Sequence, residues 1–278
     1  MKFGVFFFPT DYAIDVTDLA VALEERGMEA LFVCEHTHIP ANRKSPFPGG
    51  GDLPKRYAHA LDPFITLSFA AAVTKKLTLG TGICLLPQHE PIVTAKAIAS
   101  LDSLSGGRFE FGIGGGWNVE EMNNHGVEYK TRFKRMRKHI EAMKEIWTNH
   151  EASYNGEFVK FDRIWSDPKP ARKPHPPVLL GGETDHTLKR IVEYCDGWIP
   201  RGGPNFEPKT GMARLHQMAK DYGRDPKSLS TTVFRGPTTK EGIEACREAG
   251  IDRALYDMPD VPKDEALRTL DDIAALMK

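Results

Sequence analysis

Short runs of apolar residues recur along the chain, and each is followed by a segment whose apolar residues return every three or four positions. The short runs predict strands that are buried on both faces of a parallel sheet. They lie at 3–8, 31–34, 77–86, 109–113, 178–180, 197–200, 230–234 and 253–256.

The intervening segments have the spacing of amphipathic helices. They lie at 15–28, 62–72, 91–104, 132–147, 187–195, 208–222, 239–249 and 264–277. Eight alternations of strand and helix predict an α/β fold, a (β/α)8 TIM barrel that forms one domain over residues 1–278. An open doubly wound sheet is the alternative, but it normally has a phosphate-binding loop after its first strand, and Phe8-Pro9-Thr10-Asp11 is no such loop.

Two segments interrupt the alternation. Residues 39–61, after the second strand, are rich in Pro and Gly and predict an insertion loop with a functional role. Residues 154–165, before the fifth strand, predict a small hairpin with Asn155-Gly156 at its turn.

Composition and charge narrow the function classes. The 278 residues carry 37 Lys and Arg against 38 Asp and Glu, so no net field favours nucleic acid or an anionic membrane as a partner. The four cysteines form no CxxC pair and predict reduced thiols. The apolar N-terminal run is too short for a signal peptide, and no run reaches the length of a membrane span. We expect a soluble, cytoplasmic protein.

Candidate chemistry lies where the predicted strands end, because TIM barrels place their sites at that rim. Three of these ends are rich in glycine: Gly82-Ile83, Gly114-Gly115-Gly116-Trp117-Asn118 and Gly181-Gly182-Glu183-Thr184. A rim of bare backbone suits a flat ligand. The last of the three precedes a helix, so it predicts an anion site, to which Lys189, Arg190 and Arg201 can add charge.

Glu35-His36 ends the second strand. His36 can exchange a proton near neutral pH, and Glu35 can orient it, bind a ligand or pair with an arginine. His36 and His38 also have the alternate spacing of a zinc-binding pair in a metal-dependent hydrolase, but later strand ends offer no further histidine. We therefore expect no metal.

With these residues in order, the chain resembles the luciferase-like monooxygenase superfamily, and within it the oxidoreductases that depend on the deazaflavin coenzyme F420. The resemblance covers nearly the whole chain. It is carried by Glu35-His36 through Pro40, Leu79 through Ile83, Ser105 through Asn118, Arg132 through Trp147, and Gly181-Gly182 followed by Asp196 through Pro200.

The resemblance implies a (β/α)8 barrel and a set of site residues. Gly82-Ile83 matches a non-prolyl cis peptide behind the flavin ring, and Gly181, Gly182 and Thr184 match the region that holds the cofactor phosphate. His36 matches an acid/base position, with Glu35 beside it in place of an aspartate. Further cofactor contacts are expected at the end of the fourth strand. These are Gly114, Gly115, Trp117 and Asn118.

The sequence departs from the sugar-phosphate dehydrogenases of this branch. Trp117 stands where they have a carboxylate, and Ile39-Pro40 lies near their tryptophan, so a sugar substrate is not carried over. Gly116-Trp117 also resembles the FMN-dependent monooxygenases.

Three hypotheses follow for function. The first is hydride transfer between F420 and a small organic substrate. The second is a two-component monooxygenase that uses reduced FMN supplied by a flavin reductase. The third is a non-catalytic flavin-binding protein. We expect a homodimer, with apolar helices such as 91–104 at the interface.

Overall fold

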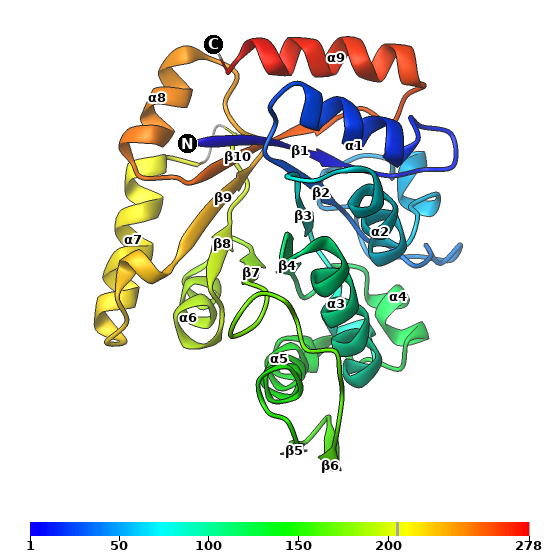
Figure 1. The fold of residues 1–278 in the computed structure, drawn as a ribbon, viewed down its shortest axis with the longest axis vertical. Coiled ribbons are helices and arrows are strands. Elements are labelled where there is room, and N and C mark those ends of the chain that lie inside the picture. Colours follow the sequence, from blue (N-terminus) through cyan, green and yellow to red (C-terminus); the bar gives the residue numbers. More distant parts are fainter. Residues whose placement is uncertain (204–205, 278) are drawn as a thin grey trace.

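Eight parallel strands close into a barrel at the centre of the molecule (Figure 1). The computed structural model describes residues 1–203 and 206–277. Around the barrel the order is β1-β10-β9-β8-β7-β4-β3-β2. The strands are β1 (Lys2–Phe7), β2 (Ala30–Val33), β3 (Thr78–Thr81), β4 (Phe109–Ile113), β7 (Val178–Gly181), β8 (Gly197–Ile199), β9 (Ser230–Phe234) and β10 (Arg253–Met258). The predicted TIM barrel is confirmed, and the open sheet is excluded because β1 pairs with both β2 and β10.

Helices surround the barrel on the outside (Figure 1). They are α1 (Val16–Glu25), α2 (Pro63–Val73), α3 (Pro91–Ser105), α4 (Val119–Asn124), α5 (Arg132–Thr148), α6 (Asp185–Tyr194), α7 (Pro208–Asp221), α8 (Lys240–Glu248) and α9 (Lys263–Ala275). Side-chain caps begin several of them: Asp62 accepts from the Ile65 N–H before α2, and Thr184 accepts from the Thr187 N–H before α6.

Three details differ from the expectations. The third strand ends at Thr81 rather than near residue 86, because the chain turns at Gly82 and continues into the 3-10 helix η2 (Leu86–Gln88). The short helix α4 was not predicted, since its six residues carry too little periodicity to stand out. The hairpin exists, but its strands β5 (Ala152–Asn155) and β6 (Lys160–Ile164) are joined by the four residues 156–159 rather than by a two-residue turn.

The floor of the barrel is closed by a buried cation. Arg253, which is 5% exposed, donates to Glu29 over 2.6 Å and to Glu110 over 2.8 Å. Its guanidinium also lies 5.4 Å from the centre of the Phe32 ring. The N-terminal end of the barrel is therefore filled, and access from solvent is left to the opposite rim, where the glycine-rich segments lie.

The two interruptions lie at different places on the barrel. The insertion after β2 contains the 3-10 helix η1 (Lys55–Ala58) and is held at the rim by a bridge between Thr10 and Ala60. The β5–β6 hairpin projects beyond α5, away from the barrel (Figure 1).

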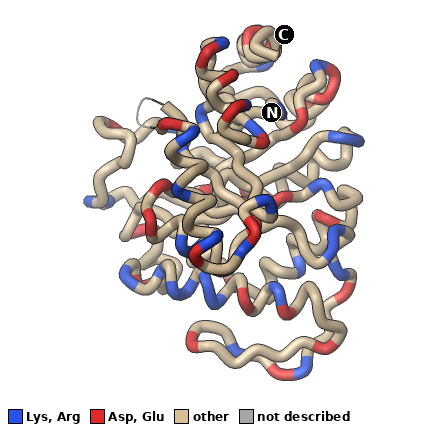
Figure 2. The backbone as a smooth tube through the Cα atoms, turned by 90° about the vertical axis from the view of Figure 1, so that its left-hand side faces the viewer, with Lys and Arg blue, Asp and Glu red and all other residues tan. Residues whose placement is uncertain are grey.

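Charge is distributed without a preferred sign. Basic and acidic residues alternate along the outer elements (Figure 2), in keeping with the balanced composition. Among residues 1–203 and 206–277, no helix combines the length and the apolar character that crossing a bilayer requires.

Candidate functional site

Ile83 is the centre of the glycine-rich rim. The Gly82–Ile83 peptide bond is cis, as the resemblance implies. The segment is anchored on both sides, since the Gly82 N–H donates to the Val33 carbonyl over 2.7 Å and the Cys84 N–H donates to the Gly112 carbonyl over 2.8 Å. The end of β3 is therefore fixed to both of its neighbouring strands, and Ile83 is held among the apolar residues at the top of the barrel.

The glycines of the neighbouring strands pack around Ile83. A Cβ atom on Gly114 would collide with the Ile83 side chain, and one on Gly181 would lie 3.4 Å from it. The structure thus brings Gly82, Ile83, Gly114 and Gly181 together at one point of the rim. Their shared surface is mostly backbone, and the Ile83 side chain packs directly on it.

Gly115 continues this wall toward a pair of arginines. A Cβ atom on Gly115 would lie 2.7 Å from the Phe133 ring of α5. The guanidinium groups of Arg132 and Arg190 lie 4.4 and 4.0 Å from the centre of that ring. Neither forms an ion pair within the part of the chain that the structure describes. Two uncompensated cations therefore flank the wall at the ends of β4 and β7.

Their electrostatics are those of an anion site. Burial, together with the nearby charge of Arg190, lowers the pKa of Arg132. Like charges brought this close gain when a ligand of opposite sign binds between them. The Nε atom of Arg132 is enclosed without a hydrogen-bond partner among the described residues, and its Nη1 atom donates to the Tyr129 carbonyl over 2.8 Å.

The segment from Gly181 to Thr184 begins α6, as predicted. Gly182 adopts a φ of 122°, a conformation that favours glycine, and its carbonyl accepts a hydrogen bond from the Trp198 indole over 2.6 Å. Thr184 is the N-cap of the helix. Its hydroxyl is therefore engaged by Thr187, and backbone N–H groups of the first turn are what the segment can offer an anion.

A cavity of about 420 Å³ adjoins this segment on the side of α7. Arginines line it, but each forms an ion pair: Arg201 with Glu183, Arg214 with Asp185, and Arg235 with Asp257. Since these charges are already compensated, the cavity is a weaker anion site than the surface around Phe133.

His36 lies at the end of β2, where the sequence predicts it, and is 8% exposed. Its Nδ1 atom lies 2.9 Å from a carboxylate oxygen of Glu121, a fully buried residue of α4. Among the described residues the Nε2 atom has no partner, and it is not enclosed. The nitrogen that remains for a substrate is therefore Nε2.

Aromatic rings cover His36. The ring of Tyr57, from the insertion loop, lies 5.1 Å from the imidazole, and that of Trp117 lies 5.9 Å away. Phe47, also from the loop, lies 5.2 Å from Tyr57 and 6.1 Å from Trp117. Trp117 thus lies beside the candidate acid/base residue, and the insertion loop forms an apolar cover over both.

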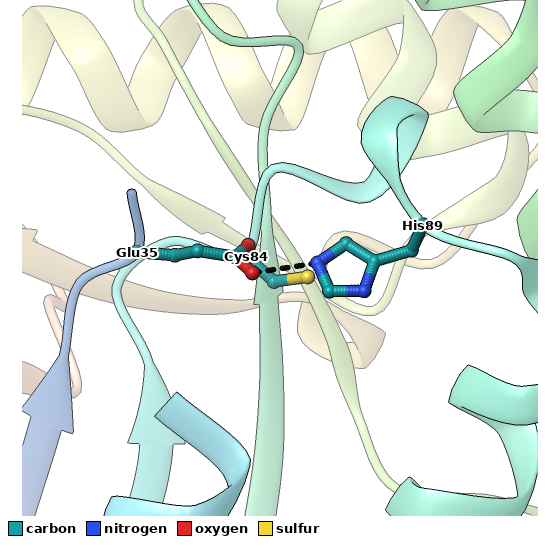
Figure 3. A group of neighbouring side chains, drawn as sticks. All are labelled: Glu35, Cys84 and His89. Atoms are coloured by element: carbon teal, nitrogen blue, oxygen red, sulfur yellow. Dashed lines mark hydrogen bonds and ion pairs between the residues drawn. The ribbon is translucent and has the colours of Figure 1, made fainter. Parts of the chain in front are cut away.

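Glu35 lies against Cys84 and His89 (Figure 3). Its carboxylate accepts from the Leu85 N–H and lies 2.6 Å from the Nε2 atom of His89. Burial opposes its ionisation, but the hydrogen bonds from His89 and the backbone lower the pKa of Glu35 below its ordinary value. Of the roles expected for Glu35, the structure shows pairing, with a histidine in place of an arginine. The carboxylate in contact with His36 is that of Glu121.

Glu35, Cys84 and His89 form a group whose ligand-type atoms lie within 4.8 Å of one another (Figure 3). Each oxygen of the carboxylate already has a hydrogen-bond partner, and burial keeps the pKa of the Cys84 thiol well above its ordinary value, so this thiol stays protonated. A structural tie between β2 and η2 explains the group without a metal. His36 and His38 do not converge, because His38 bonds to Thr37 and Asn124.

Asn118 occupies a structural position beside the rim. Its side-chain oxygen accepts from the Glu121 N–H over 3.2 Å and so caps α4, while its amide nitrogen is enclosed without a partner in the described part of the chain. Three residues of this site carried no prediction: Glu121, Arg132 and Tyr57. The Asn118-x-x-Glu121 spacing is the signal of a helix start, but nothing in it shows that the carboxylate is buried against residue 36.

Comparisons with known proteins agree with this geometry. The sequence model of the luciferase-like monooxygenase family matches residues 1–274. An uncharacterised protein of Mycobacterium tuberculosis is 39% identical over 283 residues, which cover 99% of this chain and 98% of that protein.

Two solved structures share the fold. The monooxygenase RslO1 from Streptomyces bottropensis has a TM-score of 0.78 at 18% identity, covering 100% of this chain and 98% of its own. An F420-dependent secondary alcohol dehydrogenase in complex with an F420-acetone adduct has a TM-score of 0.76 at 17% identity, covering 100% and 99%. By the family match over almost its whole length, with the barrel and the cis peptide at Gly82–Ile83 alongside, this chain belongs to the luciferase-like monooxygenase family.

Proposed function

We propose that the protein is an oxidoreductase that transfers a hydride between coenzyme F420 and a small organic substrate. The observation that carries this proposal is that the backbone wall around Ile83 and the buried His36, whose Nδ1 atom is bound to a carboxylate, follow the ends of the neighbouring strands β3 and β2. A wall without side chains accepts a ring system, and a histidine beside it manages the proton that accompanies hydride transfer.

The residues present fit a phosphorylated deazaflavin. Gly114 and Gly181 let the Ile83 side chain pack against bare backbone, so Ile83 is the side chain that this wall offers to a ring. Arg132 and Arg190 supply the positive charge that a phosphate requires, and the first turn of α6 supplies backbone donors. The ring is therefore assigned to Ile83 and the phosphate to the surface between Phe133 and Gly182.

When bound, the deazaflavin supplies the hydride acceptor or donor. The chain supplies the rest. In the oxidative direction, the Nε2 atom of His36 takes the proton from a substrate hydroxyl as the C–H bond gives up its hydride, so that an alcohol becomes a carbonyl compound. In the reverse direction the protonated His36 returns the proton to the carbonyl oxygen. Tyr57, Phe47 and Trp117 exclude water from this exchange.

A specific observation favours a second candidate. Two uncompensated arginines suit the dianionic phosphate monoester of FMN better than a singly charged phosphodiester. Proteins of this fold include both F420-dependent enzymes and monooxygenases, one of them solved with FMN. The alternative is therefore a monooxygenase that receives reduced FMN from a separate flavin reductase.

Binding measurements separate the two candidates. We expect the purified protein to bind F420 more tightly than FMN in equilibrium titration and to show the larger thermal shift with F420. Anaerobic mixing with F420 and a panel of small alcohols should then bleach the deazaflavin absorbance. Tight binding of FMN together with no F420 reduction across the panel would overturn the proposal, and oxygen uptake that depends on an added flavin reductase would establish the alternative.

A further inference from the structure

We infer that Glu121 is a positioning residue for His36: it holds the proton on Nδ1 and presents Nε2 to the substrate. This inference rests on the proposed function. It starts from the 2.9 Å contact between Nδ1 and a carboxylate oxygen of Glu121, two atoms that lie 85 residues apart in sequence.

The position of Glu121 is set by the start of α4. The chain leaves β4 through Gly116, which has a φ of 72°, and Asn118 then caps the helix by accepting from the Glu121 N–H. Glu121 is thus the third residue of the helix. In a capping box, the carboxylate at this position bonds back to the N-cap N–H. Here one of its oxygens bonds to His36 instead, so the side chain serves a residue outside its own helix.

The arrangement is costly for stability, which argues against a purely structural role. Glu121 is 0% exposed, and among the described residues its second oxygen, Oε1, is enclosed without a hydrogen-bond partner. A buried acceptor in this state destabilises the fold, and an apolar residue of similar volume would pack there without the penalty. The hydrogen bond to His36 therefore gives the reason for a carboxylate at this buried position.

The chemistry follows from the hydrogen bond. A carboxylate accepts only, so Nδ1 must be the donor, and the neutral imidazole is held as the Nδ1–H tautomer with a lone pair on Nε2. When Nε2 takes the substrate proton, the adjacent carboxylate stabilises the imidazolium that results. Among the described residues, the two aromatic rings beside the imidazole, those of Tyr57 and Trp117, bring no charge, and the Arg43 guanidinium lies 5.5 Å from the centre of the Trp117 ring. Glu121 is the charged group in direct contact with this histidine.

The test uses the full-length Glu121→Gln variant, which keeps the volume and removes the charge. Nitrogen-15 spectra of the histidine side chains, with His36 assigned from His36→Asn, report the tautomer without any turnover. We expect the Nδ1–H tautomer in the unmodified protein and a mixture of tautomers in the variant. With F420 and a substrate from the panel, we expect kcat to fall on the order of 10²-fold at unchanged F420 affinity. The limb of the pH–rate profile that reports the proton transfer should also shift along the pH axis.

Two further variants keep the test decisive. Glu121→Asp retains the charge and should recover part of the lost rate, whereas Glu244→Gln, an exposed glutamate on α8, should leave spectrum and rate unchanged. Adding Glu121→Gln to His36→Asn should cause no further loss, because the carboxylate acts through the imidazole.

An unchanged His36 tautomer in Glu121→Gln, or an unchanged rate in a protein that turns F420 over, would overturn the inference. If the unmodified protein reduces no F420 while the tautomer shifts as expected, the proposed function fails and the pairing of the two residues stands. If Glu121→Gln does not fold, Glu121→Met, which also keeps a side chain of similar volume without a charge, carries the same spectral comparison.

Discussion

The arginines near the barrel rim differ in whether an acidic side chain pairs with them. Arg137 on α5 pairs with Glu141 and Glu193, as surface arginines commonly do. Arg132, five residues earlier on the same helix, forms no such pair among the described residues and stacks on Tyr129 and Phe133 instead. The contrast within one helix points to a ligand that supplies the missing negative charge.

Replacing Arg132 or Arg190 with alanine should therefore weaken cofactor binding. Each charge-assisted contact with a phosphate contributes about 1.5–3 kcal/mol, so the Kd of the preferred cofactor should rise about 10- to 100-fold. Isothermal titration of the two variants measures this, with Arg137→Gln as the matched control on α5. Wild-type affinity in both variants would show that the phosphate binds elsewhere.

Arg253 illustrates the opposite case, a charge that is fully paired. Arg253→Met removes the partner of Glu29 and Glu110 and should lower the free energy of unfolding by about 3–5 kcal/mol, because carboxylates remain behind in the barrel floor. Urea unfolding at pH 7 measures this loss. A change within 0.5 kcal/mol, the usual range for surface substitutions, would mean that water replaces the arginine.

Acid should affect the unmodified protein through the same group. Burial opposes ionisation of Glu29, but Arg253 lowers the pKa of Glu29 in the folded state. A carboxyl group whose pKa is lowered in the folded state stabilises the fold at pH values above its ordinary pKa. This stabilisation is lost as the pH falls from the ordinary pKa through the lowered one. The stability of the unmodified protein should thus decline below about pH 4.5, and Arg253→Met should show a smaller decline in the same unfolding series.

The residue scale also shows what sequence can predict about such a site. The glycine-rich strand ends were predictable because backbone demands leave a local signature, whereas the cis peptide at Gly82–Ile83, which the structure has, followed only from the family resemblance. Glu121 was not predictable, because its role depends on the contact with residue 36, which only the closed barrel creates. Glu35 is as suitable as His36 in the sequence, yet beyond the end of β2 the two side chains have different partners, His89 for Glu35 and Glu121 for His36.

At the scale of elements, the connection between β3 and α3 is tied to the end of β2 by the Glu35–His89 pair. Burial opposes protonation of His89, but the Glu35 carboxylate raises the pKa of His89 above its ordinary value. A raised folded-state pKa stabilises the protein below the ordinary value near pH 6.5, and this contribution is lost as pH rises through the folded value.

Removing the pair should make stability less dependent on pH. The free energy of unfolding of the unmodified protein should fall between pH 6.5 and the folded-state value, and His89→Gln should remove this fall while lowering stability at pH 6 by about 1.5–3 kcal/mol. Chemical unfolding from pH 6 to 9 checks both, with His150→Gln, an exposed histidine, as the control. Parallel pH curves for His89→Gln and the unmodified protein would contradict the assignment.

The elements themselves were predicted where periodicity is long and missed where it is short. The strand–helix alternation and helix α5 are confirmed because each carries several turns of apolar spacing. Strand β3 ends earlier than its apolar run, since an apolar segment can leave a sheet and still be buried, as Leu85 and Leu86 are. Helix α4 has six residues, too few for a period to emerge.

At the scale of the whole molecule, one outer face of the barrel is unusually apolar. Ile65, Phe69 and Val73 recur every fourth residue of α2 and are 63%, 60% and 42% exposed. Val93 and Leu104 of the neighbouring helix α3 are also exposed. The expected homodimer is therefore proposed to form through α2 as well as α3, since a stripe of this kind usually covers a partner.

A charge in the middle of that stripe should prevent the association. Phe69→Asp is expected to convert a dimer into a monomer with unchanged secondary structure, because the carboxylate would be buried without a partner at a two-fold interface. Analytical ultracentrifugation measures the mass. Trp165→Ser, which changes an exposed aromatic residue of the β5–β6 region, should leave the mass unchanged. A protein that is monomeric at micromolar concentration before any substitution would disprove the dimer.

The backbone wall around Ile83 and the aromatic cover over His36 are built from different kinds of structure. The wall consists of the ends of paired strands. A Cβ atom added to Gly114 would collide there with the Ile83 side chain. The cover consists of aromatic side chains on residues 39–61. This segment is bound near its end by the Thr10–Ala60 bridge and at its middle by hydrogen bonds between Ser45 and residues 119 and 120 of α4. Exchanging that segment for one of different length and chemistry should therefore redirect the enzyme to new substrates while leaving its coenzyme preference intact, which makes the insertion the natural starting point for engineering.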